Sequence, residues 1–190
     1  MSSENKARTA TAREVQIESG TATLEGELRL PADATGLVLF AHGSGSSRHS
    51  PRNQYVARVI REAGVGTLLF DLLTREEESI DIHTRHLRFD IGLLARRLID
   101  ATNWIMSKQD YRDVRIGYFG SSTGGGAALV AAAELGDQIG AVVSRGGRPD
   151  LAGEALRHVK SPTLLIVGGY DEPVIEMNEE AMALLRSEKE

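Results

Sequence analysis

Val114-Arg-Ile-Gly-Tyr-Phe-Gly-Ser-Ser-Thr-Gly-Gly-Gly-Ala-Ala-Leu129 is the stretch that decides the fold. It predicts a short buried strand that runs into Gly120-Ser-Ser-Thr-Gly124, followed by a helix of small residues. A G-x-S-x-G pattern between a strand and a helix is typical of a serine on a sharp, strained turn. The N-terminus of the following helix favours negative charge beside the serine oxygen. The pattern therefore predicts Ser122 as a nucleophile; the alternative is a glycine-rich turn whose serine only caps a helix.

Composition narrows the class of protein. With 190 residues, 41% of them hydrophobic and 26% charged, the chain suits one globular domain. The net charge of −5 gives no general attraction to nucleic acid or to an anionic membrane. The chain contains no cysteine, which excludes a disulfide scaffold, a thiolate nucleophile and a cysteine-held zinc site.

The N-terminal residues 1–14 are polar and lack the apolar segment of a signal peptide, so we expect a flexible tail there. No apolar run approaches the roughly 20 residues that span a bilayer. The expected location is cytoplasmic, with no membrane partner and no nucleic-acid partner.

Hydrophobic patterning predicts the α/β class, with a single domain over residues 15–190. Alternation around Ser19-Gly20 predicts an antiparallel hairpin with one wet face. Strands that alternate with helices favour a mostly parallel sheet covered on both faces, a doubly wound arrangement. The further buried strands are expected at 37–41, 65–70, 141–144 and 163–167, and the further helices at 54–62, 83–107, 151–159 and 177–186.

The carboxyl ends of three strands carry residues that suit acyl transfer. Attack by Ser122 on a carbonyl builds an oxyanion, which needs two preorganised donors. The backbone N–H groups of Thr123, directly after the serine, and of Ser44, in the loop after the strand at 37–41, are the candidates. His42 in that loop is interpreted as a structural histidine whose ring bonds local backbone. Asp171 would orient a catalytic imidazolium, and its alternative role is a cap before the following helix.

Five motifs follow one another in an order that is characteristic of one superfamily. They are His42-Gly-Ser-Gly-Ser-Ser47, Phe70-Asp-Leu-Leu-Thr-Arg-Glu-Glu77, Gly117-Tyr-Phe-Gly-Ser-Ser-Thr-Gly-Gly-Gly126, Ser144-Arg-Gly-Gly-Arg-Pro-Asp150 and Val167-Gly-Gly-Tyr-Asp-Glu-Pro-Val174. Their order resembles the α/β-hydrolase superfamily and, within it, the dienelactone-hydrolase-like branch. The resemblance implies a serine or cysteine nucleophile at the elbow, here Ser122, and an aspartate matching Asp171. It suggests a small carboxylic ester or lactone as substrate, with no cofactor and no metal.

One departure from the family pattern concerns the general base. The resemblance implies a histidine on a loop after a further strand, followed by a closing helix, and no histidine follows Asp171. The chain is therefore expected to be shortened at its C-terminus and impaired, because a serine without a base is a poor nucleophile. Removal of that last strand would leave Thr163–Val167 as an open sheet edge, which could pair with a second copy in a homodimer. The five histidines of the chain are His42, His49, His83, His86 and His158.

Several alternatives stay open. His49 could reach the mouth of the site and serve as a base, and Arg48 and Arg52 could receive an anionic group of a substrate. Asp150 is a second candidate for the acid. A catalytically inactive binding or assembly module would reuse the same fold without chemistry. A nucleotide-binding role is disfavoured because neither glycine run fits a dinucleotide or P-loop pattern.

Overall fold

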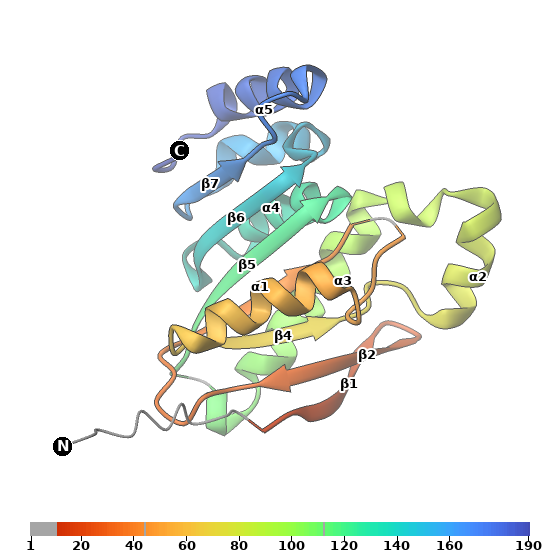
Figure 1. Cartoon of the computed structure of the whole chain (residues 1–190), viewed down its shortest axis with the longest axis vertical. Coiled ribbons are helices and arrows are strands. Elements are labelled where there is room, and N and C mark those ends of the chain that lie inside the picture. Colours follow the sequence, from red (N-terminus) through yellow and green to blue (C-terminus); the bar gives the residue numbers. More distant parts are fainter. Residues whose placement is uncertain (1–10, 44, 112) are drawn as a thin grey trace.

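The computed structural model describes residues 11–43, 45–111 and 113–190. Its centre is a seven-stranded sheet with the order β1-β2-β4-β3-β5-β6-β7 (Figure 1). The β1–β2 and β2–β4 pairs are antiparallel, and the remaining neighbours are parallel. The predicted α/β fold, with a mostly parallel sheet and an antiparallel N-terminal hairpin, is confirmed. The strands are β1 (Arg13–Ser19), β2 (Ala22–Arg29), β3 (Gly36–Ala41), β4 (Gly66–Phe70), β5 (Arg115–Ser122), β6 (Ile139–Gly147) and β7 (Thr163–Ile166).

Helices cover both faces of this sheet. In Figure 1, α1 crosses in front of the strands, whereas α3 and α4 lie behind them. The α-helices are α1 (Pro51–Glu62), α2 (Arg75–Thr84), α3 (Ile91–Met106), α4 (Thr123–Leu135) and α5 (Glu172–Leu184). The short 3₁₀ helices are η1 (Leu87–Phe89), η2 (Gln109–Tyr111), η3 (Gly136–Gln138) and η4 (Pro149–His158).

The two faces of the sheet bury two groups of apolar side chains. Under α1, a small cluster joins Phe40, Ala57, Leu69 and Phe119. The phenylalanine rings of β3 and β5 lie 5.1 Å apart, centroid to centroid. The opposite face packs against α3 and α4 and holds the larger cluster, in which Leu39, Leu68 and Tyr118 are almost completely buried. Because the central strands are buried on both faces, their sequences are continuous hydrophobic runs.

The region between β4 and α3 differs from the single long helix expected over 83–107. The chain forms α2, then η1, then α3, because capping residues end the first helix and start the last one. Thr74 and Glu77 make a capping box at the start of α2, and Arg85 ends that helix in the left-handed conformation. Asp90 then accepts a hydrogen bond from the Leu93 N–H and starts α3.

Two other helices begin earlier than expected. We expected α1 from residue 54 and α5 from residue 177, but they start at Pro51 and Glu172. Both carry a proline in the first turn, where its missing N–H leaves no helical bond unmade. The prolines therefore mark helix starts, and the periodic apolar residues that led to the prediction begin one turn later.

The last strand, β7, forms an edge of the sheet. Leu164 is 37% exposed and Ile166 is 44% exposed. The backbone of residues 188–190 lies along this strand, since the Thr163 N–H donates to the Glu188 carbonyl and the Leu165 N–H to the Glu190 carbonyl. The edge is therefore partly covered by the chain's own residues. Pairing of Thr163–Val167 with a second copy stays a prediction.

Among the helices of the described residues, none combines the length and the apolar character that crossing a membrane requires. At the N-terminal side, β1 begins at Arg13, two residues before the expected start of the domain.

A buried ion pair fastens α2 to the rest of the molecule and gives a first prediction. Arg97 of α3 is 3% exposed, and its guanidinium donates to both Glu77 carboxylate oxygens and to the Leu72 carbonyl. Glu77→Ala leaves this buried charge without its carboxylate and should lower the free energy of unfolding by about 3 kcal/mol.

Urea unfolding followed by circular dichroism measures this loss. Glu76→Ala is the control, because Glu76 is an exposed neighbour on the same helix and its removal should change the stability by less than about 0.5 kcal/mol. Equal stability of the two variants would contradict the assigned role of the Glu77–Arg97 pair.

Candidate active site

The candidate site lies at the carboxyl edge of the parallel strands. Strand β3 is followed by α1 and pairs with β4 on one side and with β5 on the other. Loops that leave neighbouring strands in opposite directions open a crevice at such a switch point, where ligands of open α/β sheets bind. The loop after β3 and the junction of β5 with α4 border this crevice.

Ser122 sits at the junction of β5 and α4 with unusual backbone angles. Its φ is +51° and its ψ is −128°, and Arg85 is the other described non-glycine residue with positive φ. Such a conformation costs about 1–3 kcal/mol and persists only where the surroundings enforce it. The β5–β6 register shifts at Ser121/Ser122, and the Arg148 N–H donates to the Ser122 carbonyl at 3.0 Å. The turn is therefore fixed from the β6 side.

Glycines fix the turn from the other side. A Cβ on Gly43 would lie 2.7 Å from the Ser122 Cβ, so the loop after β3 touches the serine directly. A Cβ on Gly124 would collide with the Ala41 carbonyl oxygen, which shows how closely the first turn of α4 approaches the end of β3. Glycine is required at both positions, because the Ser122 Cβ in one case and the Ala41 backbone in the other occupy the space that a side chain would need.

Ser122 lines a cleft of about 300 Å³. Its walls come from the loop after β3, from the first turn of α1, and from the ends of β5 and β6. The lining residues are Gly43, Ser46, Ser50, Arg52, Asn53, Ser121, Ser122, Arg145 and Gly146. The serine is thus at the surface of a concavity and outside the packed core.

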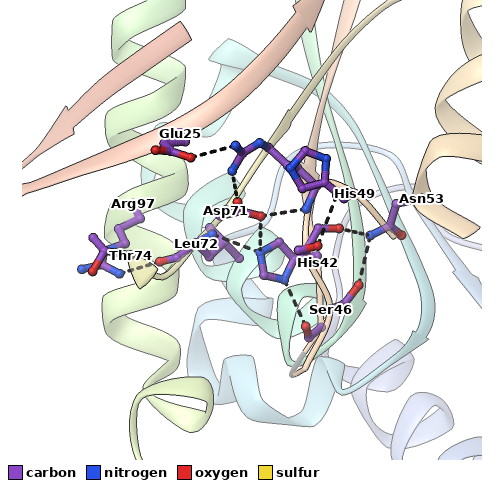
Figure 2. Close-up of polar contacts among 12 residues, drawn as sticks. Glu25, His42, Ser46, His49, Asn53, Asp71, Leu72, Thr74 and Arg97 are labelled. Carbon is purple, nitrogen blue, oxygen red and sulfur yellow. Dashed lines mark hydrogen bonds and ion pairs between the residues drawn. The ribbon is translucent and has the colours of Figure 1, made fainter. Parts of the chain in front are cut away.

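His42 is structural, as the sequence indicated. Its Nε2 accepts a hydrogen bond from the Leu72 N–H at 3.1 Å, and its Nδ1 donates to the Gly43 carbonyl at 3.0 Å. Burial lowers the pKa of this imidazole, against opposing contributions from the Gly43 carbonyl and Asp71. Figure 2 shows the ring between the loop after β3 and the residues that follow β4. Because both ring nitrogens are engaged with backbone, His42 has no lone pair for Ser122.

The loop after β3 is also held by an ion-pair network. The Arg48 backbone N–H donates to Asp71 at 2.7 Å, and the Arg48 guanidinium bonds both Asp71 and Glu25 (Figure 2). The expected anion-receiving role of Arg48 is therefore wrong, because two carboxylates already neutralise it. Arg52, the other arginine named from the sequence, does line the cleft.

Asp171 lies at the same edge of the sheet as Ser122, two strands away. It follows β7, directly precedes α5, and has an exposed side chain that makes no capping hydrogen bond. The helix-cap alternative for its carboxylate therefore has no support in the structure. Asp150, the second candidate for the acid, is held by Arg148 through its guanidinium at 2.7 Å.

The other predicted groups are placed as follows. Thr123 is buried at the N-terminus of α4, next to Ser122, and Ser44 lies outside the described residues. No histidine of the described residues lines the cleft. His49 is exposed in the loop after β3, and His158 ends η4, before the amino end of β7.

No group of three or more acidic or histidine side chains that could hold a metal ion occurs within residues 11–43, 45–111 and 113–190.

Arg145 is a cleft residue that the sequence analysis did not single out. It pairs in register with Ser121 across β5 and β6 and contributes to the wall beside Ser122. A signal for it was present, since a charged residue near the carboxyl end of a buried parallel strand faces the functional edge of the sheet.

Comparisons with known proteins agree with this architecture. The chain is 62% identical to a structure described as a dienelactone hydrolase from Anabaena variabilis, with a TM-score of 0.93 over 95% of this chain and 84% of that one. An esterase structure from Pyrococcus furiosus shares the fold at 17% identity, with a TM-score of 0.73 over 95% of this chain and 81% of that chain.

A longer relative comes from Mycobacterium tuberculosis and is named "Putative phosphoribosyl transferase". It is 56% identical over 172 residues, which is 90% of this chain and 38% of that protein. The chain thus spans well under half the length of this relative. The model of the Dienelactone hydrolase family matches residues 28–188. With the fold, the elbow and this match in agreement, the chain belongs to the dienelactone hydrolase family.

Proposed function

We propose that this protein is a serine hydrolase that cleaves a small carboxylic ester or lactone through an acyl-enzyme at Ser122. The observation that carries the proposal is the positive φ of Ser122 at the strand–helix junction that borders the cleft. Strained backbone at such a junction exposes the hydroxyl while it brings the serine next to the start of a helix. Membership of the hydrolase family supports the same class of reaction.

The proposed first step is attack of the Ser122 oxygen on the substrate carbonyl. A base takes the hydroxyl proton, a C–O bond forms, and the carbonyl oxygen becomes an oxyanion. The backbone N–H of Thr123 and that of Ser44 are the proposed donors to this oxyanion, helped by the positive end of α4. Collapse of the intermediate expels the alcohol, and water then releases the acid.

Asp171 is the proposed acid that orients the imidazole of the base. The sequence places no histidine after Asp171, and the described histidines lie outside the cleft. The base is therefore proposed to come from outside the residues of this chain, and the chain by itself should be an impaired hydrolase. An inactive binding module that reuses the fold is the competing proposal.

A small substrate suits the short connections around the cleft. Between the end of β6 and the start of β7, the chain forms only η4 and its flanking turns. The longer relative named a phosphoribosyl transferase matches this chain over 38% of its own length, and the matched part overlaps the region that matches the hydrolase family, which favours a hydrolase for this chain.

The nucleophile is tested with a fluorophosphonate probe and mass mapping of the labelled peptide. With imidazole added as the base, Ser122 should be labelled, and Ser122→Ala should abolish labelling because the attacking oxygen is gone. Ser79→Ala is the control, because Ser79 is an exposed serine of α2 outside the cleft, and its variant should label as the parent does. A folded protein that takes up no label would favour the binding module.

The role of Asp171 is tested by supplying the base from solution. Hydrolysis of p-nitrophenyl acetate, after subtraction of the Ser122→Ala rate, should rise with imidazole concentration. Asp171→Asn should lower this imidazole-dependent rate by about tenfold or more, since the acid holds the ring in its productive tautomer.

Glu172→Gln, a change at the adjacent exposed acid of α5, is the control and should keep the imidazole-dependent rate. Equal rates for Asp171→Asn and Glu172→Gln would remove Asp171 from the site.

A further inference from the structure

Two arginines beside Ser122 have no acidic partner among the described residues. Arg52 comes from the first turn of α1 and Arg145 from the end of β6, and both line the cleft that contains Ser122. No hydrogen bond or ion pair of either guanidinium occurs within the described parts of the chain. Other arginines near this edge of the sheet are each paired with a carboxylate; these are Arg48, Arg88, Arg97 and Arg148.

The direction of Arg145 follows from its strand. Successive side chains of a strand alternate between the two faces. Ser144 is completely buried and contacts Gly125 of α4, so it points to the α4 face. Arg145 therefore points to the α1 face, toward the side of the sheet on which Arg52 lies.

The position of Arg145 costs free energy. Its Nε is buried and has no hydrogen-bond partner in the described structure. Burial lowers the pKa of this guanidinium, and the charge of Arg52 lowers it further. Both effects disfavour the charged form, yet an arginine keeps its proton at neutral pH. An anion bound by both guanidinium groups would offset the repulsion between them and part of the cost of burial.

The start of α1 adds positive potential to the same wall. Its N-cap residue, Ser50, makes no capping hydrogen bond with its side chain, and the first turn contains no acidic residue. The N-terminal end of a helix carries a partial positive charge that favours anions. The protein as a whole is negative, at −5, so this local positive charge is specific to the cleft.

We propose that Arg52, Arg145 and the N-terminus of α1 form a subsite for a phosphate group carried by the ester substrate, an inference that rests on the proposed hydrolase function of Ser122. A phosphate monoester carries close to two negative charges and three acceptor oxygens. Two guanidinium forks and a helix end match this group better than the single charge of a carboxylate. The subsite would fix the substrate with its acyl carbonyl toward Ser122.

Inorganic phosphate is the probe, and isothermal titration calorimetry at low salt measures its dissociation constant. The parent protein should bind phosphate, and Arg145→Gln and Arg52→Gln should each weaken binding at least about fivefold through loss of a charge-assisted hydrogen bond. Arg58→Gln is the matched control, because Arg58 is an exposed arginine of the same helix that pairs with Glu62 outside the cleft, and it should bind as the parent does.

Acetate tests the nature of the anion. It should bind at least about fivefold more weakly than phosphate, and equal affinities would overturn the assignment to a phosphate group. Absence of phosphate binding, or binding that survives both cleft substitutions, would overturn the subsite itself.

The Ser122→Ala variant separates this inference from the proposed function. It should bind phosphate like the parent, because the subsite does not need the nucleophile. Phosphate binding that depends on both arginines, in a protein that fluorophosphonate does not label, would support the anion site and reject only the hydrolase mechanism. Labelling at Ser122, together with phosphate binding that both arginine substitutions leave unchanged, would support the hydrolase mechanism and reject the anion site.

Discussion

The enforced positive-φ turn at Ser122 is the constraint on which the rest of the site depends. The peptide after the serine is fixed by the Arg148 N–H, and its surroundings are fixed by backbone contacts at Gly43 and Gly124. These contacts come from the residue after β6, the loop after β3 and the first turn of α4, so separate segments at the centre of the fold support the strain. A local sequence alone could not hold such a turn, since each contact would be lost in an isolated peptide.

Charge is distributed unevenly around this turn. The network of Arg48 with Asp71 and Glu25 neutralises the loop after β3 on the side away from the cleft. His42 stays in one tautomer because backbone groups engage both nitrogens. The cleft itself keeps two cations that have no carboxylate partner among the described residues, which gives the site a polarity opposite to that of the protein as a whole. The charges of the supporting loop are therefore neutralised by ion pairs, whereas the charges of the two cleft arginines are left for a ligand.

Much of the fold could be predicted from the sequence because its signals are local. A few neighbouring residues are enough to identify the apolar strands β3 and β4 and the glycine-rich elbow. The sequence did not predict α2, although the Thr74–Glu77 capping box is present in it. The predicted helix at 83–107 began before the actual start of α3 and took in the end of α2.

Other features of the site arise only from tertiary contacts. The Arg48–Asp71 pair joins two loops 23 residues apart, and the isolation of Arg145 depends on which face of β6 meets α1. No spacing rule contains that information. The places of Ser122 and Asp171 at one edge of the sheet followed from strand order, whereas their chemical roles remain predictions.

The composition of α4 has a consequence for the order in which the structure forms. Its first turn contains Gly124, Gly125 and Gly126, which are poor helix formers, and all three are buried against neighbouring backbone or side chains. We expect this helix to be stable only once the sheet has closed around it, because packing must replace the missing intrinsic propensity. The hydroxyl of Ser122 would then gain its proposed reactivity only after folding is complete.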